Sequence, residues 1–290
     1  MKRILLVIIP LHILFVGCTS PRGDADKTDQ PQEDTLQYVQ ELEYLLPSPA
    51  EFFSVVQEVG LEYDQQIIRP IESITNFQLY RNQALNFGLY LSDFSYLLLF
   101  DKQSEAIKYL YQIQEMAMLL EIENYFDDEF FNKLLSKLNE PDSVRAIAIE
   151  QSAAFFNRMD MVGNQDLALL ITSGSIIETM YIALNVVNEK KITDKTITTI
   201  VDLAYIFDSF YLNFTITQPK GDEITPLAED LNELRKIFNS MAISQVSKAI
   251  RKDGNLVLTS EITHEVNEYN VKKMKLMVNT IRKKIVTQVY

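Results

Sequence analysis

The sequence predicts an all-α protein, built as a multi-helix bundle or as two packed helical layers. The chain has 290 residues but only 8 glycines and 9 prolines, so few positions interrupt regular structure. Apolar residues recur at alternating steps of three and four, which is typical of the buried face of a helix. Runs with the two-residue alternation of strands are scarce. We therefore expect residues 36–290 to form a single helical domain.

Capping and breaking residues mark helices in the first half of the chain. Ser48 and Pro49 start a helix that Gly60 ends. Pro141 ends a helix that begins at Asp127. Two apolar stripes lie between these helices: Phe77, Tyr80, Ala84, Phe87, Leu91, Phe94 and Leu98, then Ala106, Tyr109, Ile113, Met116 and Leu120.

Longer helices follow in the second half. The helical pattern covers residues 142–159, 165–187 and 194–212, and Thr225-Pro226 starts another helix that runs to Met241. In the third of these segments the apolar residues that share a face are Ile200, Leu203, Phe207, Phe210 and Phe214.

One segment departs from the helical pattern. Residues 246–258 alternate around the turn Asp253-Gly254-Asn255, so we expect a short β-hairpin there. A closing helix is predicted from about Ser260 onward. Its apolar stripe is Val271, Met274, Val278, Ile281 and Ile285.

The amino terminus has the features of a secretory signal. Lys2 and Arg3 precede an apolar run, Ile4 to Val16. At about 1.5 Å per helical residue this run reaches only about 20 Å, short of the ~30 Å bilayer core. We therefore expect residues 1–17 to be a cleaved signal peptide. Residues 18–35, which contain no large apolar side chain, are expected to form a disordered acidic tether.

The segment Phe15-Val16-Gly17-Cys18 resembles the lipobox of bacterial lipoproteins, although Phe15 replaces the usual leucine. In that family the cysteine is diacylated and becomes the new amino terminus. The resemblance implies that acylated Cys18 attaches this chain to a membrane of the cell envelope, the outer membrane, with the periplasmic and surface faces both open. The alternative is an ordinary secretory signal, or a short buried helix, with an incidental cysteine.

The chain is acidic, with a formal net charge of −13. Nucleic-acid binding depends largely on Lys and Arg that neutralise phosphates, so this balance argues against nucleic acid as a partner. Residues 248–290 nevertheless carry nine basic and four acidic side chains. We interpret them as a basic terminal helix that packs on an acidic body. Contact with anionic lipid or with an acidic partner is the alternative.

The residue inventory excludes most familiar catalytic and metal sites. Without the signal peptide the chain has one histidine, His264, which we expect on a helix surface. The zinc pattern HExxH, the GxSxG nucleophile motif and glycine-rich phosphate loops are absent. The sequence therefore predicts no metal site, no cofactor and no catalytic residue. The chemistry that remains open is that of paired carboxylates, or of a hard cation held by oxygens.

Two apolar helical segments each contain an isolated carboxylate. In NFGLYLSDFSYLLLF, Asn86, Tyr90 and Asp93 are spaced i, i+4 and i+7 on one face. Glu178 is the only charged residue in LLITSGSIIETMYIALNVV. A buried carboxylate is costly unless it is paired or hydrogen-bonded. We therefore predict that these four residues form an internal polar cluster, structural or ligand-binding, in which Tyr90 and Asn86 are candidate donors.

Small residues accompany both carboxylates. They are Gly88, Ser92 and Ser95 in the first segment and Ser173-Gly174-Ser175 in the second. Small side chains let helix backbones approach, so we expect close helix packing at these patches.

The run Asn86 to Tyr90 with Asp93, Tyr96 and Phe100, followed by the small-residue patch and Glu178, resembles a group of uncharacterised helical lipoproteins common in Bacteroidetes. The resemblance implies a shared helical fold and no activity. We therefore expect a lipid-anchored envelope protein that binds or scaffolds a protein partner. The alternative is an enzyme, or a protein that binds a cation or small ligand, through Asp93 and Glu178.

Overall fold

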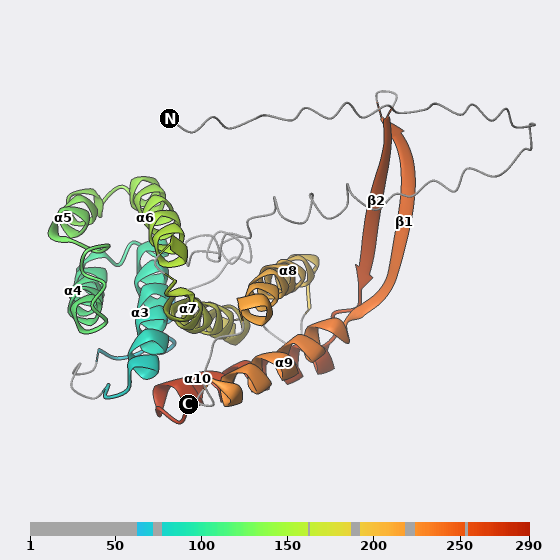
Figure 1. Cartoon of the computed structure of the whole chain (residues 1–290). Helices are drawn as coiled ribbons and strands as arrows, with labels where there is room; N and C mark the ends of the chain where they lie inside the picture. Colours follow the sequence, from blue (N-terminus) through green and yellow to red (C-terminus); the bar gives the residue numbers. More distant parts are fainter. Residues whose placement is uncertain (1–62, 72–76, 162, 187–191, 218–223, 253–254) are drawn as a thin grey trace, which may run out of the picture. The chain divides into compact units, whose positions relative to one another are not determined.

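The computed structural model describes residues 63–71, 77–161, 163–186, 192–217, 224–252 and 255–290 (Figure 1). The chain divides into two units, residues 1–43 and 44–290, and every described residue belongs to the second. The predicted signal peptide, Cys18, the tether and the helix at 48–60 lie outside the described residues.

Eight helices form the described part of the chain, which confirms the all-α prediction. They are α3 (Tyr80–Leu99), α4 (Gln103–Leu119), α5 (Asp128–Lys137), α6 (Pro141–Met161), α7 (Gln165–Val186), α8 (Asp194–Thr217), α9 (Thr225–Asn239) and α10 (Glu268–Val286). Seven of them begin within a few residues of their predicted starts, because caps and apolar stripes are local signals. Asp127, for example, caps α5 by accepting a hydrogen bond from the backbone N–H of Phe130 at 2.8 Å.

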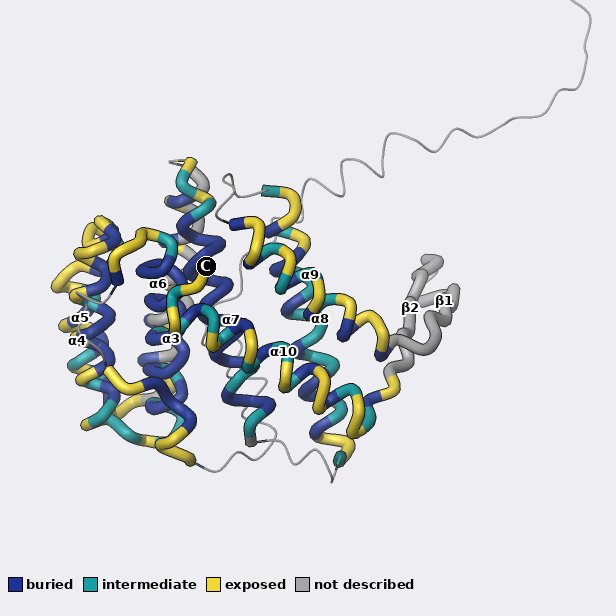
Figure 2. The backbone as a smooth tube through the Cα atoms, turned by 90° about the horizontal axis from the view of Figure 1, so that it is seen from below, coloured by how far each residue is buried: buried dark blue, intermediate teal, exposed yellow. Residues whose placement is uncertain are grey.

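Helices α3 and α7 occupy the centre of the core. They pack against each other more extensively than any other helix pair, while α4 covers α3, and α10 packs mainly on α7 and α9. Figure 2 shows α3 and α7 buried along most of their length, whereas α4, α5 and α10 have buried and exposed faces. Among the described helices, one segment, Gln165–Asn185, is long and apolar enough to span a bilayer, but 94% of its apolar 18-residue window is buried in the protein. It is therefore the core helix around which the others pack.

Two glycines allow the close crossing of α3 and α7. A Cβ atom on Gly88 would clash with the carbonyl oxygen of Ile171 and lie 2.7 Å from the backbone nitrogen of Ser175. A Cβ on Gly174 would clash with the carbonyl oxygen of Leu85. The serines beside them bond across the interface: Ser92 donates to Ser175 O at 2.9 Å, and Ser175 donates to Gly88 O at 3.0 Å. The predicted small-residue packing is confirmed.

The β-hairpin between α9 and α10 is longer than the sequence predicted. Strands β1 (Ala242–Lys252) and β2 (Asn255–His264) pair antiparallel, with Lys252 opposite Asn255 at the tip. The closing helix therefore begins at Glu268, capped by Asn267, and not near Ser260. His264, expected on a helix, is the last residue of β2. Strand pairing across the hairpin accounts for both differences, since it extends the strands beyond the short alternating segment.

Candidate functional site

Asp93 and Glu178 meet at the interface of α3 and α7. Neither side chain has any exposed surface, and the two carboxyl groups lie close enough to interact. A hydrogen bond between them would require one carboxylic acid and one carboxylate, because two carboxylates can only accept.

Arg282 of α10 forms an ion pair with Glu178. Its Nε and Nη2 donate to the two carboxylate oxygens at 2.6 and 2.7 Å, a bidentate geometry. The guanidinium carbon also lies 4.0 Å from the ring centroid of Tyr181, one turn along α7. These contacts fix the position of the Glu178 carboxyl group against α10.

Burial favours the protonated form of Asp93. Burial raises the pKa of Asp93 well above its ordinary value, and the neighbouring charge of Glu178 raises it further. The charge of Arg282 and the backbone N–H of Arg69, which donates to Asp93 Oδ2 at 3.3 Å, offset this only in part. Within the described chain no group donates a hydrogen bond to Asp93 Oδ1.

Asn86 and Tyr90 bond to a different part of the chain, the segment 63–71 that precedes α3. Both are fully buried. Arg69 Nη1 donates to Asn86 Oδ1, and the Tyr90 hydroxyl donates to Pro70 O at 3.3 Å. These hydrogen bonds of Asn86 and Tyr90, predicted as candidate donors to Asp93, go to segment 63–71. Their i, i+4, i+7 spacing shares a face with Asp93, and Arg69 bonds to both Asn86 and Asp93.

Arg69 links the two halves of the polar cluster. Its backbone N–H reaches Asp93, its side chain reaches Asn86, and its carbonyl oxygen accepts a hydrogen bond from Tyr109 of α4. The guanidinium carbon lies 5.2 Å from the ring centroid of Tyr90 and 5.3 Å from that of Phe77. These contacts hold segment 63–71 against α3 and α4.

Sequence reasoning missed Arg69 and Arg282. A signal existed for Arg282: it follows Ile281 and lies four residues after Val278, at the edge of the apolar stripe of α10. A basic residue at such an edge can reach a buried acid. Arg69 lies in a segment without helical period, so no pattern indicated its role.

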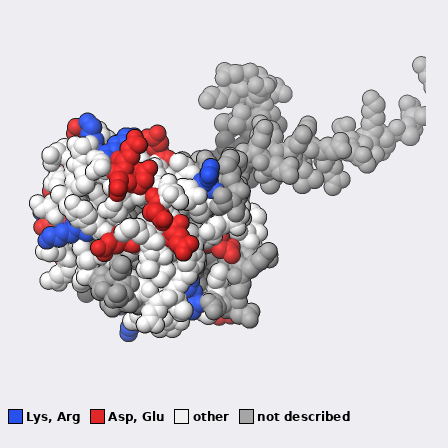
Figure 3. All heavy atoms as spheres, turned by 60° about the vertical axis from the view of Figure 1, so that its left-hand side comes forward, with Lys and Arg blue, Asp and Glu red and all other residues white. Residues whose placement is uncertain are grey.

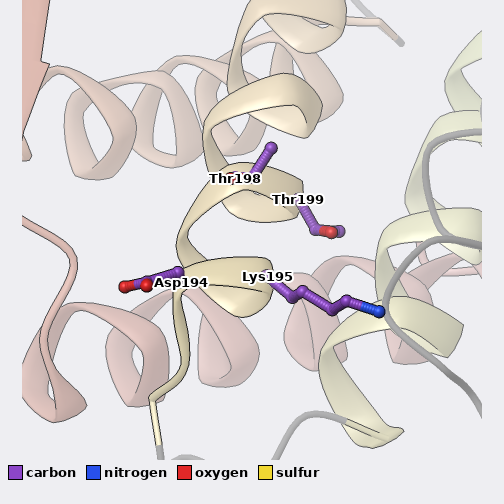
Figure 4. Close-up of a pocket in the computed structure, with 4 residues that line it drawn as sticks. All are labelled: Asp194, Lys195, Thr198 and Thr199. Carbon is purple, nitrogen blue, oxygen red and sulfur yellow. The ribbon is translucent and has the colours of Figure 1, made fainter.

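A surface pocket of about 360 Å³ lies at the start of α8, away from the carboxyl pair. Asp194, Lys195, Thr198 and Thr199 line it, and in Figure 4 the side chains of Asp194 and Lys195 extend in different directions. None of the four predicted cluster residues lines this pocket. The carboxyl pair therefore does not open into it.

The geometry suits a structural cross-link better than carboxylate catalysis. Glycoside hydrolysis requires two carboxyl groups about 5 to 10 Å apart with a substrate between them. Here both carboxyls are closed to solvent, and Glu178 is already paired with Arg282. In the described ranges, no group of three or more His, Cys, Asp or Glu side chains is placed to hold a metal ion. The cluster joins α3, α7, α10 and segment 63–71.

Protein-family models, curated proteins and solved structures give no match to this chain. The resemblance to bacterial helical lipoproteins therefore stays a prediction from the sequence.

Replacement Asp93→Asn tests the protonation of this carboxyl. The folded protein binds the proton of Asp93 more tightly than the unfolded chain, so wild-type stability falls as the pH rises above 3.8, the ordinary pKa of aspartate. Asparagine keeps a donor toward Glu178 and an acceptor for Arg69 but cannot ionise. We expect the variant to melt close to wild type near pH 4 and at a higher temperature than wild type near pH 8.

The control for this experiment is Glu115→Gln, which removes the same charge from an exposed position of α4. Its melting temperature should differ from wild type by a small amount that is equal at both pH values. If Asp93→Asn instead destabilises the protein at alkaline pH, Asp93 is charged in the folded state and the assignment of the proton is wrong.

Proposed function

We propose that this chain is a lipid-anchored protein of the cell envelope that acts as a binding or scaffolding module. The observation that carries the proposal is the closed carboxyl pair: the most distinctive polar residues of the chain are enclosed and bonded to protein groups. Enclosed groups of this kind stabilise a fold, so binding to a partner would use the surface of the protein. The lipobox at Phe15-Val16-Gly17-Cys18 supports the anchor.

Two or three acyl chains would hold the protein stably at a bilayer, whereas one chain binds only marginally. A helical body on a tether of residues 18–35 can then meet partners along the membrane surface. An enzyme or cation-binding protein that uses Asp93 and Glu178 would need those carboxyls to be accessible. Their burial favours the binding or scaffolding role over both alternatives.

A single experiment with two readouts tests this proposal. Wild type and Cys18→Ser are produced in bacterial cells at matched levels, and each is captured from envelopes after cross-linking. We expect wild type to begin at an acylated Cys18 by mass spectrometry, to fractionate with membranes, and to capture a reproducible envelope protein. The Cys18→Ser variant should lose the acyl group and the membrane fractionation.

Thr28→Ala, in the predicted tether, is the matched control and should behave as wild type in both readouts. An intact amino terminus at Met1, or an unmodified thiol at Cys18 on protein released from the cells, contradicts the anchor. Repeated cross-linking captures that yield no common partner contradict the binding role.

A further inference from the structure

The side of α10 that faces away from the core carries both large apolar and basic side chains. Tyr269 and Leu276 are 71% and 68% exposed, and Lys272, Lys273 and Lys283 are exposed beside them. We call these five residues the outer face of α10. Tyr269, Leu276 and Lys283 are seven residues apart, so they fall on one line about 21 Å long. A flat surface can touch the whole line at once.

Two other basic residues of α10, Arg282 and Lys284, are paired with acids of the body. Arg282 pairs with Glu178, and Lys284 donates to Asp230 of α9 at 2.5 Å. These contacts support the prediction that the basic terminal helix packs on acidic groups of the body. Exposed Glu268 lies in the first turn of α10, so the three lysines of the outer face leave this side of the helix with an excess of positive charge.

The acidic surface of the protein lies on other helices. Exposed acids gather on α4, α5 and the turn between them: Glu115, Glu121, Glu123, Asp127, Asp128 and Glu129. Figure 3, which brings this side forward, shows Asp and Glu spread over the face. Helices α4 and α5 lie on the α3 side of the core, whereas α10 packs mainly on α7 and α9. An anionic surface would therefore attract the outer face of α10 and repel the acidic face.

We propose that the outer face of α10 docks on a bilayer that contains anionic phospholipid. Lysines around exposed tyrosine and leucine are typical of helices that lie in the plane of a membrane interface. The lysines would meet headgroup phosphates while Tyr269 and Leu276 enter the interface. The docking gives the proposed envelope protein a second contact with the membrane. It rests on the proposed location, but it does not need the acyl group.

A tryptophan reporter tests the docking directly, because the chain contains no tryptophan. The protein used begins at residue 18 with Cys18→Ser, since residues 1–43 and 44–290 are separate units and no acyl chain is then present. Leu276→Trp should show a blue-shifted emission with vesicles of phosphatidylcholine and phosphatidylglycerol, and none with phosphatidylcholine alone. Tyr111→Trp, at a 55% exposed site on α4, should not shift with either.

Removal of lysine charges identifies which surface of the protein binds the vesicles. Each lysine near an anionic membrane strengthens binding about five-fold, so Lys272→Gln with Lys273→Gln should weaken vesicle binding about 25-fold at low salt. The matched control is Lys133→Gln with Lys137→Gln on α5, which removes the same charge from exposed ion pairs and should change binding little.

Three results would overturn the proposal: equal binding to neutral vesicles, equal loss in both double variants, or no vesicle binding at all. If no vesicles bind, we would infer that the outer face of α10 binds an acidic protein surface instead. Because the tested chain carries no acyl group, these outcomes are independent of the mass spectrometry of Cys18. Failure of the docking and failure of the lipid anchor are thus separate results.

Discussion

Replacement of Arg282 by alanine is expected to lower the free energy of unfolding by about 3–5 kcal/mol, because it leaves the carboxylate of Glu178 buried without its cation. Arg282 donates two hydrogen bonds to Glu178, and Glu178 has no exposed surface. For a domain of this size each kcal/mol corresponds to about 2–4 °C in melting temperature. Thermal unfolding followed by circular dichroism should therefore show a fall of roughly 6–20 °C.

The chain contains a matched control for this variant. Arg235 also pairs with a carboxylate, Asp208, at 2.7 Å, and its guanidinium lies 4.8 Å from the ring centroid of Tyr211. The two side chains of this pair are 36% and 46% exposed, however, so Arg235→Ala should cost only about 0–1 kcal/mol. An equal decrease in the free energy of unfolding in the two variants would show that the ion pair of Arg282 and Glu178 is not desolvated.

A double variant separates the lost ion pair from lost packing. Glu178→Gln with Arg282→Met removes both charges together and keeps an acceptor for the proton of Asp93. Replacement of a buried pair by neutral groups of similar volume is often close to neutral in stability. We expect this double variant to be more stable than Arg282→Ala alone, and the reverse order would contradict the account of the site.

Replacement of Gly88 by alanine is expected to destabilise the protein by about 3 kcal/mol or more. The new Cβ meets the carbonyl oxygen of Ile171 and lies 2.7 Å from the nitrogen of Ser175, and both are backbone atoms of α7 that no rotamer change can move. Helices α3 and α7 would have to separate, which also weakens the bonds of Ser92 and Ser175. The measurement is the midpoint of urea unfolding, with the slope of the transition as a check that the folded state is otherwise unchanged.

Gly163→Ala is the contrasting variant. Gly163 has φ +71°, and a Cβ there would meet nothing within 4 Å. Its cost should be about 1–2 kcal/mol, the penalty for the left-handed conformation alone. A Gly88 variant that costs less than the Gly163 variant would show that the crossing of α3 and α7 has room for a methyl group.

Local patterns made most of the helices predictable. The stripe Val271, Met274, Val278, Ile281 and Ile285 is fully buried in α10, because a period near 3.6 aligns apolar side chains on one face without reference to other elements. The burial of Asp93 and Glu178 was predictable for a similar reason, since each is an isolated charge in an apolar helix. Neither inference requires knowing which residue of the chain contacts these side chains.

The residues that bond to Glu178 and Asp93 could be identified only from the folded structure. Glu178 and Arg282 are 104 residues apart, and α10 offers six basic residues whose local patterns differ little. Asp93 and Arg69 are 24 residues apart, and Arg69 lies outside any helix. The limits of the hairpin and the start of α10 depend likewise on pairing between β1 and β2. Long-range pairing is set by packing of the whole chain, which no single segment encodes.

The separation of Glu178 from Arg282 also has a consequence for biosynthesis. At about 5–20 residues per second, a ribosome adds the intervening 104 residues in roughly 5–20 s. During that interval the nascent polypeptide contains the acid but lacks its counterion. Any early collapse must leave Glu178 hydrated or protonated, so the native core closes only after translation has passed α10.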